Sequence, residues 1–245
     1  MRDKITKSKI IRFKKALKLR SPIIGVEFAS KVPKEVKHFK DTACTALARV
    51  KNGGIDIHFD FKKHCQLCSG ADYFLGSKKI TDDDVKDVYV KDEHVFENKK
   101  ICNAFLKAIP VMPGKFIGKK IIIRPFRPSS KSQVIILFVN SAQAGRILGL
   151  LNYSFFSKVE IYPCQSTCLA FFAPLVTEMP HINFIDYYDR YFQGKINGKY
   201  LWKENEMIIS LDRKHFSSLI ENVAKSPHGG YARVRVDAKK VDPFE

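Results

Sequence analysis

The hydrophobic and polar positions change period several times along the chain, and each change marks an expected element. Alternation with a period of two predicts half-buried strands, and continuous β-branched runs predict strands buried on both faces. Apolar positions at helical spacing, between a capping residue and a glycine or proline, predict helices. Expected strands cover 21–28, 55–61, 119–126, 133–139, 158–163, 205–212 and 231–236. Expected helices cover 41–54, 68–76, 81–90, 97–109, 140–155, 168–176 and 213–226.

Strand–helix–strand units of this kind predict an α+β fold, a mixed β-sheet with flanking helices in a single domain. Residues 1–20 predict a basic amphipathic helix in front of that domain, which would then cover 21–245. Ile10, Phe13 and Leu17 fall on one face of the first helix. We expect this apolar stripe to pack on the body of the protein.

The formal net charge is +18, and nearly half of the excess lies in residues 1–20, where nine Lys and Arg accompany Asp3 alone. A basic face of this kind binds nucleic acid or anionic lipid, or is simply solvated. Lysine outnumbers arginine 32 to 11, whereas phosphate and base recognition favour arginine. No zinc-finger spacing or helix-turn-helix signal accompanies the charge. Nucleic acid is therefore a possible partner, but not the favoured one.

The longest apolar runs, 134–139 and 168–176, fall well short of the roughly 20 residues of a membrane span. Basic residues also interrupt any apolar core that a signal peptide would need near the N-terminus. We therefore expect a cytoplasmic protein, in which thiols stay reduced. A chain of 245 residues needs no disulfide or metal to build a core, so its six cysteines raise a question of chemistry.

The cysteines are Cys44, Cys65, Cys68, Cys102, Cys164 and Cys168. The spacing of the 65/68 and 164/168 pairs suits zinc or an iron–sulfur cluster, but matches neither a zinc ribbon nor a ferredoxin run. Cys44, Cys68 and Cys168 all fall at expected helix N-termini, where free N–H groups and the helix dipole lower a thiol pKa and favour an anionic cluster. Cys102 lies mid-helix among apolar residues and is expected to be a core thiol.

Five segments, in order, resemble the domain-of-unknown-function family 169, from about residue 22 to residue 223. They are ACTALARVKNGG, CSGADYFLG, FVNSAQAGRILGLL, PCQSTCLAFFAPLV and NEMIISLD. The matching positions are Cys44; Cys68, Gly70, Leu75 and Gly76; Asn140, Ala142, Gln143, Ala144 and Arg146; and Gln165, Ser166, Cys168 and Pro174. The resemblance implies an iron–sulfur or other cysteine–metal group, in a family of mostly archaeal and anaerobic bacterial proteins.

One departure from the family pattern changes the expected ligand set. The family commonly has a further cysteine in the region that here reads HINFIDYYDRYF, which keeps Asn183 and Arg190 but has no cysteine. Either Cys65 or Cys164 then replaces the missing thiol, or one ligand position stays open. An oxygen or nitrogen ligand from Asp186, Tyr187, Tyr188 or a nearby histidine is a further alternative. His64, beside Cys65, is the histidine in a metal-like context, but its position favours a surface role over a ligand role.

Three polar residues on one expected helix are candidates for substrate binding. Asn140, Gln143 and Arg146 follow a strand, where α/β sheets present ligand contacts. Gln143 and Arg146 share a helix face and could hold a carboxylate or phosphate. The alternative for Asn140 is that it, or Ser141, merely caps the helix.

The sequence therefore predicts an iron–sulfur protein, with a [4Fe–4S] cluster held by Cys44, Cys68 and Cys168 and by Cys65 or Cys164. Such a cluster would act on a small anionic substrate, as in a lyase or oxidoreductase, or pass electrons to a redox partner. The alternative is a zinc- or thiol-stabilised binding module whose basic surface engages nucleic acid or an acidic partner. A third hypothesis is a protein without a cofactor in which the cysteines are core residues.

Overall fold

A mixed eight-stranded sheet forms the centre of the protein, with the strand order β2-β3-β4-β1-β5-β10-β7-β6. The structure is a computed structural model that describes residues 5–60, 69–75, 81–112, 114–116, 118–162, 167–196 and 198–230. The strands are β1 Ile24–Ala29, β2 Lys37–His38, β3 Ile57–Asp60, β4 Lys120–Pro125, β5 Val134–Val139, β6 Glu160–Tyr162, β7 His181–Phe184 and β10 Met207–Asp212. Neighbours are antiparallel except for the pairs β2–β3 and β6–β7. This sheet confirms the expected α+β fold.

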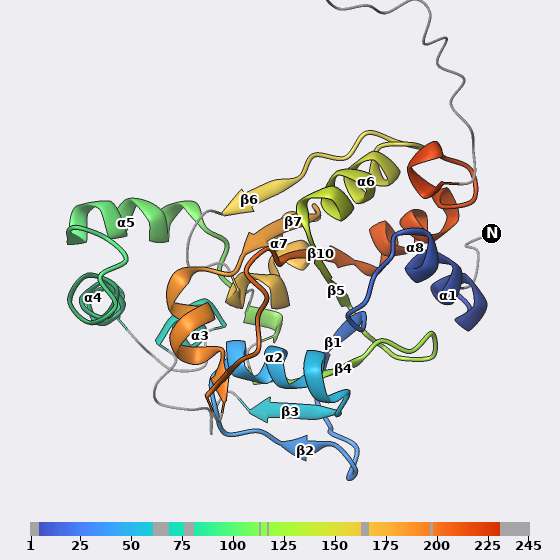
Figure 1. Ribbon diagram of the computed structural model, residues 1–245. Helices are drawn as coiled ribbons and strands as arrows, with labels where there is room; N and C mark the ends of the chain where they lie inside the picture. The colour runs from blue at the N-terminus through green and yellow to red at the C-terminus, as the bar shows by residue number, and fades with distance from the viewer. Residues whose placement is uncertain are drawn as a thin grey trace, which may run out of the picture.

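Helices cover both faces of the sheet. They are α1 Lys7–Ala16, α2 Ala43–Gly53, α3 Ser69–Phe74, α4 Asp82–Asp87, α5 Lys99–Ala108, α6 Ser141–Leu151, α7 Ala173–Thr177 and α8 Arg213–Asn222. Figure 1 shows α4 and α5 on the left, far from α1, α6 and α8 on the right, with strands between the two groups. Among the described residues, no helix is both long and apolar enough to cross a membrane.

Strand β5 shows how the sequence builds these layers. All six of its residues are buried, as its continuous apolar run predicts. Because side chains alternate along a strand, Val134, Ile136 and Phe138 enter one core, with α2, α3 and α5. The intervening residues of β5 enter a second core, with α1, α6 and α8. The sheet is therefore the middle of three layers.

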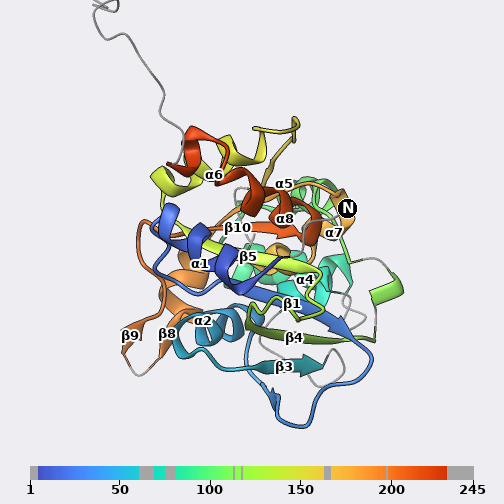
Figure 2. The same ribbon diagram turned by 90° about the vertical axis from the view of Figure 1, so that its right-hand side faces the viewer.

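The expected basic N-terminal helix forms as α1, with Thr6 as its cap. Phe13 and Leu17 on its apolar stripe are completely buried. The ring of Phe13 meets Phe216 of α8 edge to face, with centroids 5.7 Å apart. In Figure 2, α1 runs across the front of the molecule, on the side of α8. Its basic residues therefore surround an apolar contact that holds the helix on the body.

The structure differs from the sequence-based expectations in several places. The expected helix 168–176 is divided into a 3-10 helix, η3 Cys168–Phe171, and the short α7, because Phe172 between them has non-helical backbone angles, φ −144° and ψ −20°. The expected helix 81–90 continues as a π-helix, η1 Val88–Asp92. Strand β7 was not predicted as a separate element, nor was the hairpin of β8 Lys195–Ile196 and β9 Lys199–Tyr200, which projects at the lower left of Figure 2. The expected strand 231–236 lies outside the described residues.

Candidate functional site

Two of the predicted metal-ligating cysteines meet in the folded protein. The Sγ atoms of Cys44 and Cys168 are 3.8 Å apart, although 124 residues separate them in the chain. Both side chains are buried, with exposed fractions of 2% and 7%, and both belong to the core between the sheet and α2, α3 and α5. Sequence reasoning assigned these two residues to one site, and the structure brings them together.

Helix α2 fixes the position of Cys44. The hydroxyl of Thr42 caps the helix by accepting a hydrogen bond of 3.2 Å from the N–H of Thr45, and Gly54 ends it in the left-handed conformation at φ 63°. Cys44 lies in the first turn, where backbone N–H groups have no intrahelical acceptor. The expected location of Cys44 at a helix N-terminus is therefore confirmed.

Cys168 is held differently. It begins η3, a 3-10 helix of four residues, so it lies at a single tight turn rather than at the N-terminus of a long helix. The preceding residue, Thr167, is completely buried. The short element gives the Cys168 thiol little of the dipole field that the sequence analysis expected. The surroundings of this thiol are mainly apolar.

A buried carboxyl that the sequence analysis did not identify lies beside the two thiols. Asp189 is 5% exposed and accepts a hydrogen bond from the thiol of Cys44. Burial, together with the nearby charge of Asp186, raises the pKa of this carboxyl well above its usual range. Asp186, a predicted alternative ligand, instead accepts a 2.9 Å hydrogen bond from the Asp189 N–H.

The pattern Asp-Tyr-Tyr-Asp was a signal for this arrangement. An aspartate that caps a helix turn directs the residue three positions later along the first turn. Asp189 opens the π-helix η4 Asp189–Gln193, and π-helical turns are frequent at functional sites. Asp186, the capping residue, was predicted as an alternative ligand, whereas Asp189, which the cap positions, was not.

The two thiols fit the donor set of a metal site. Two thiolates bound tetrahedrally at ~2.3 Å to one ion lie about 3.8 Å apart, the distance found between Cys44 and Cys168. Within the described residues, no group of three or more His, Cys, Asp or Glu side chains could hold a metal ion. Cys65, Cys68, Cys164 and His64 lie outside the described residues. Helix α3, which starts directly after position 68, packs against η3.

Cys102 belongs to the core, as expected. It is completely buried in the middle of α5. Burial raises the pKa of its thiol, which keeps the thiol protonated. Cys102 therefore provides a control for experiments on the other cysteines.

The three predicted substrate-binding residues line one cleft of about 580 Å³ at the start of α6. Asn140 caps α6, and Gln143 completes a capping box. The Gln143 amide also donates to the carbonyls of Leu17 and Lys18, at 3.2 and 2.9 Å. Asn140 and Gln143 thus build the wall of the cleft and join α1 to α6.

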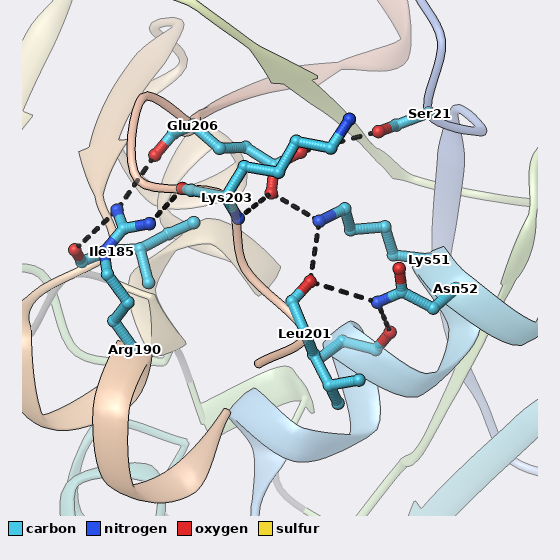
Figure 3. Close-up of polar contacts among 9 residues, drawn as sticks. Ser21, Lys51, Asn52, Ile185, Arg190, Leu201, Lys203 and Glu206 are labelled. Atoms are coloured by element: carbon cyan, nitrogen blue, oxygen red, sulfur yellow. Dashed lines mark hydrogen bonds and ion pairs between the residues drawn. The ribbon is translucent and has the colours of Figure 1, made fainter. Parts of the chain in front are cut away.

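A buried ion pair connects this cleft to α2. The ammonium of Lys51, on α2, bonds the carboxylate of Glu206, and the two side chains are 4% and 6% exposed. The same ammonium donates to the Leu201 carbonyl at 3.0 Å. Desolvation lowers the pKa of Lys51. Figure 3 shows the Glu206 carboxylate between Lys51, the Lys203 N–H and the Ser21 hydroxyl.

Arg190 holds the loop that carries Glu206. It is 9% exposed, and its guanidinium donates to the carbonyls of Ile185, Lys203 and Glu206 (Figure 3). This arginine, retained from the family pattern, thus shapes the wall of the cleft. It makes these contacts entirely with backbone oxygens.

Comparison with known proteins gives a family but no activity. No curated protein and no solved structure matches the chain at a significant level. The profile of the domain-of-unknown-function family 169, described as uncharacterised ArCR, matches residues 12–222. This range includes both buried cysteines, Asp189 and the cleft, and it agrees with the resemblance found in the five sequence segments. The chain belongs to this family of uncharacterised proteins.

Proposed function

We propose that this protein binds a thiolate-ligated metal centre through Cys44 and Cys168. The observation that carries the proposal is the 3.8 Å distance between the two buried sulfurs, which come from α2 and η3. Cys68 and either Cys65 or Cys164 complete the ligand set in this proposal. Soft thiolate donors select zinc or iron–sulfur clusters over harder ions.

The distance between the sulfurs also bears on the kind of metal. Two cysteines on one metal atom, whether zinc or one iron of a [2Fe–2S] cluster, take up this short spacing. In a [4Fe–4S] cluster each iron has its own cysteine, so the two sulfurs lie farther apart and Cys44 and Cys168 would have to rotate away from each other. An iron–sulfur cluster remains our first candidate. Zinc, which also fits the observed distance between the two sulfurs, is the second.

The residues around the sulfurs suit either occupant. Asp189 accepts a hydrogen bond from the thiol of Cys44, and such contacts orient a metal-binding side chain and tune its charge. The apolar core around Cys168 excludes water. A bound cluster would supply electron transfer, or a Lewis-acidic iron where one ligand position stays open.

The proposed chemistry concerns a small anionic substrate or a redox partner, with lyase and oxidoreductase as the reaction classes. The described structure sets one limit on it. Lys51 lies seven positions after Cys44 in α2, which is about 10 Å along the helix axis. A ligand in the cleft beyond Lys51 and Glu206 is therefore better placed to exchange electrons with a metal at Cys44 than to coordinate it.

Anaerobic purification followed by iron, sulfide and zinc analysis tests the proposal. We expect either iron with sulfide and a visible absorption band, or colourless protein with zinc. Cys44→Ser and Cys168→Ser should each lower the metal content severalfold, because each removes one of four ligands. Cys102→Ala is the matched control and should keep the metal of the wild type.

Three results would contradict the metal centre. One is wild-type protein that contains neither iron nor zinc after anaerobic purification. A second is a Cys44→Ser/Cys168→Ser variant that retains the metal content of the wild type. Peptide mapping that finds Cys44 and Cys168 joined as a disulfide in the anaerobic protein would likewise overturn it.

A further inference from the structure

The cleft at the start of α6 has the size and shape of a small-ligand site. Its volume of about 580 Å³ lies within the ~300–1,000 Å³ typical of such sites. Phe138 and Val139, at the carboxyl end of β5, supply apolar lining, and both are buried. The first turn of α6, the end of α1 and the loop before β10 supply the remaining walls.

The charges that line the cleft do not balance. Lys18, Arg20, Arg146 and Lys203 line it, and Glu206 is the acidic residue among the described lining residues. Glu206 is already paired with Lys51. Within the described part of the chain, none of the four lining cations lies within ion-pair distance of a carboxylate. The cleft therefore concentrates positive charge that the described residues do not neutralise.

The side chains of two of these cations, Lys203 and Arg146, are placed in ways that bear on ligand binding. The ammonium of Lys203 extends past Glu206 without a polar partner among the residues drawn in Figure 3. The guanidinium of Arg146 is oriented by the 2.8 Å bond from its Nε to the carbonyl of His228. That bond uses one of the five N–H groups of Arg146, and the planar fork has others to offer a ligand.

Lys18 occupies a position at which glycine is normally preferred. It has a φ of 53° directly after the C-terminus of α1. The Leu19 N–H donates to the Lys14 carbonyl at 2.9 Å, and the Lys18 N–H donates to the Lys15 carbonyl at 3.2 Å. These two bonds make a Schellman motif, in which the left-handed residue is usually glycine. A lysine there carries backbone strain and adds a cation to the cleft.

We propose that this cleft binds a small oxyanion with two or more negative charges, such as a phosphate ester or a polycarboxylate. Four lining cations call for more than one negative charge on the ligand. The inference deepens one part of the proposed function, the binding of a small anionic substrate, and rests on that part alone. It does not need the metal centre.

Calorimetric titration of the full-length protein as isolated tests this site. The probes are pyrophosphate, orthophosphate and citrate at low ionic strength, because salt screens such contacts. We expect pyrophosphate or citrate to bind more tightly than orthophosphate. Whichever of pyrophosphate and citrate binds more tightly shows whether the natural ligand is a phosphate ester or a polycarboxylate.

Variants locate the binding. Arg20→Gln/Lys203→Gln should weaken the affinity for the stronger probe by about tenfold or more, and Lys18→Gly should weaken it severalfold without loss of folding. Lys107→Gln, an exposed lysine on α5 at the far side of the molecule, is the matched control and should stay within about twofold of the wild type.

Three outcomes would overturn the inference. The first is that the wild type binds none of the three probes, and the second is that the Arg20→Gln/Lys203→Gln variant binds them as tightly as the wild type does. The third is that only a single-stranded oligonucleotide binds, with a steep salt dependence, which would favour the nucleic-acid alternative. Titration of Cys44→Ser separates the two proposals. Retained anion binding in protein without metal leaves this inference standing when the metal centre fails.

Discussion

The cysteine pair and the basic cleft lie at opposite ends of the same helix, in opposite environments. Cys44, in the first turn of α2, is surrounded by apolar core and a buried carboxyl. Lys51, in the last turn, bonds Glu206, which lines an open, positively charged cleft. The buried end can hold a reactive group in a fixed geometry, whereas the open end can exchange a soluble ligand. In the proposed function, the metal centre therefore lies in the buried core, and the soluble ligand enters through the open cleft.

Removing the Lys51–Glu206 ion pair, which joins α2 to the cleft, should have the largest effect on stability. Lys51→Met leaves Glu206 buried without its cation, and breaking one partner of a buried pair costs about 3–5 kcal/mol of the free energy of unfolding. Urea denaturation measures this loss. Lys51→Met/Glu206→Leu, which removes both charges, should recover a large part of it. Equal destabilisation of the single and double variants would mean that packing, and not charge, dominates this junction.

Replacing one glycine in each region by alanine should change the free energy of unfolding in opposite directions. At Gly70, in α3 on the cysteine side, an added Cβ would lie 2.5 Å from the hydroxyl oxygen of Tyr89, so Gly70→Ala should cost about 1–3 kcal/mol. At Gly145, in α6 beside the cleft, nothing lies within 4 Å of the added Cβ, so Gly145→Ala should add about 0.5–1 kcal/mol. Thermal unfolding of the two variants compares them directly. Shifts of the same sign would show that the two regions are packed alike.

Low pH should lower the folding stability of the cysteine side of the protein through His181. Burial lowers the pKa of this histidine to about 4, and its ring stacks on Tyr162 and contacts the hydroxyl of Thr177 in α7. A base whose folded-state pKa lies below its unfolded value loses stabilising free energy as the pH falls from about 6.5 toward 4. Between pH 7 and pH 5 this loss amounts to somewhat under 2 kcal/mol.

The raised pKa of Asp189 acts in the opposite direction, because protonation of that carboxyl favours the folded state as the pH falls. The measurement is therefore the difference between wild type and His181→Gln in urea denaturation at the two pH values. We expect the variant to gain on the wild type as the pH falls. Parallel pH profiles of the two proteins would exclude this role for His181.

The smallest effect is expected at Lys18. Lys18→Gly relieves the left-handed backbone but gives the unfolded chain more freedom, so the net gain in the free energy of unfolding should be at most about 1 kcal/mol. Thermal unfolding without added anion measures it. A clear loss of stability would show that the lysine side chain supports the fold rather than the cleft.

The sequence predicted the architecture well because its signals are local. Asn140, one of the two expected caps, caps α6, and the apolar run of β5 is buried on both faces. The pairing of Cys44 with Cys168 was accessible through their shared chemistry and the family resemblance. Their 3.8 Å contact depends on how η3 packs against the sheet and α3, which no local pattern encodes.

The parts that sequence reasoning missed depend on distant contacts. Asp189 becomes part of the cysteine site because η4 packs on α2, and its burial could not be read from its neighbours in the chain. Gln143 was expected to hold a ligand, but its amide is engaged by the carbonyls at the end of α1. The capping-box pattern of Asn140 and Gln143 was visible in the sequence and could have indicated this structural role.

Helix α2, bounded by Thr42 and Gly54, has a mechanical consequence. Its continuous backbone hydrogen bonds make two to three turns of helix stiff along the axis, so a displacement of Cys44 along that axis reaches Lys51 almost undiminished. There it changes the separation of a buried cation and anion, whose interaction varies steeply with distance in a medium of low polarisability. A rod of this kind converts a shift of a fraction of an ångström at one end into a change of electrostatic potential at the other.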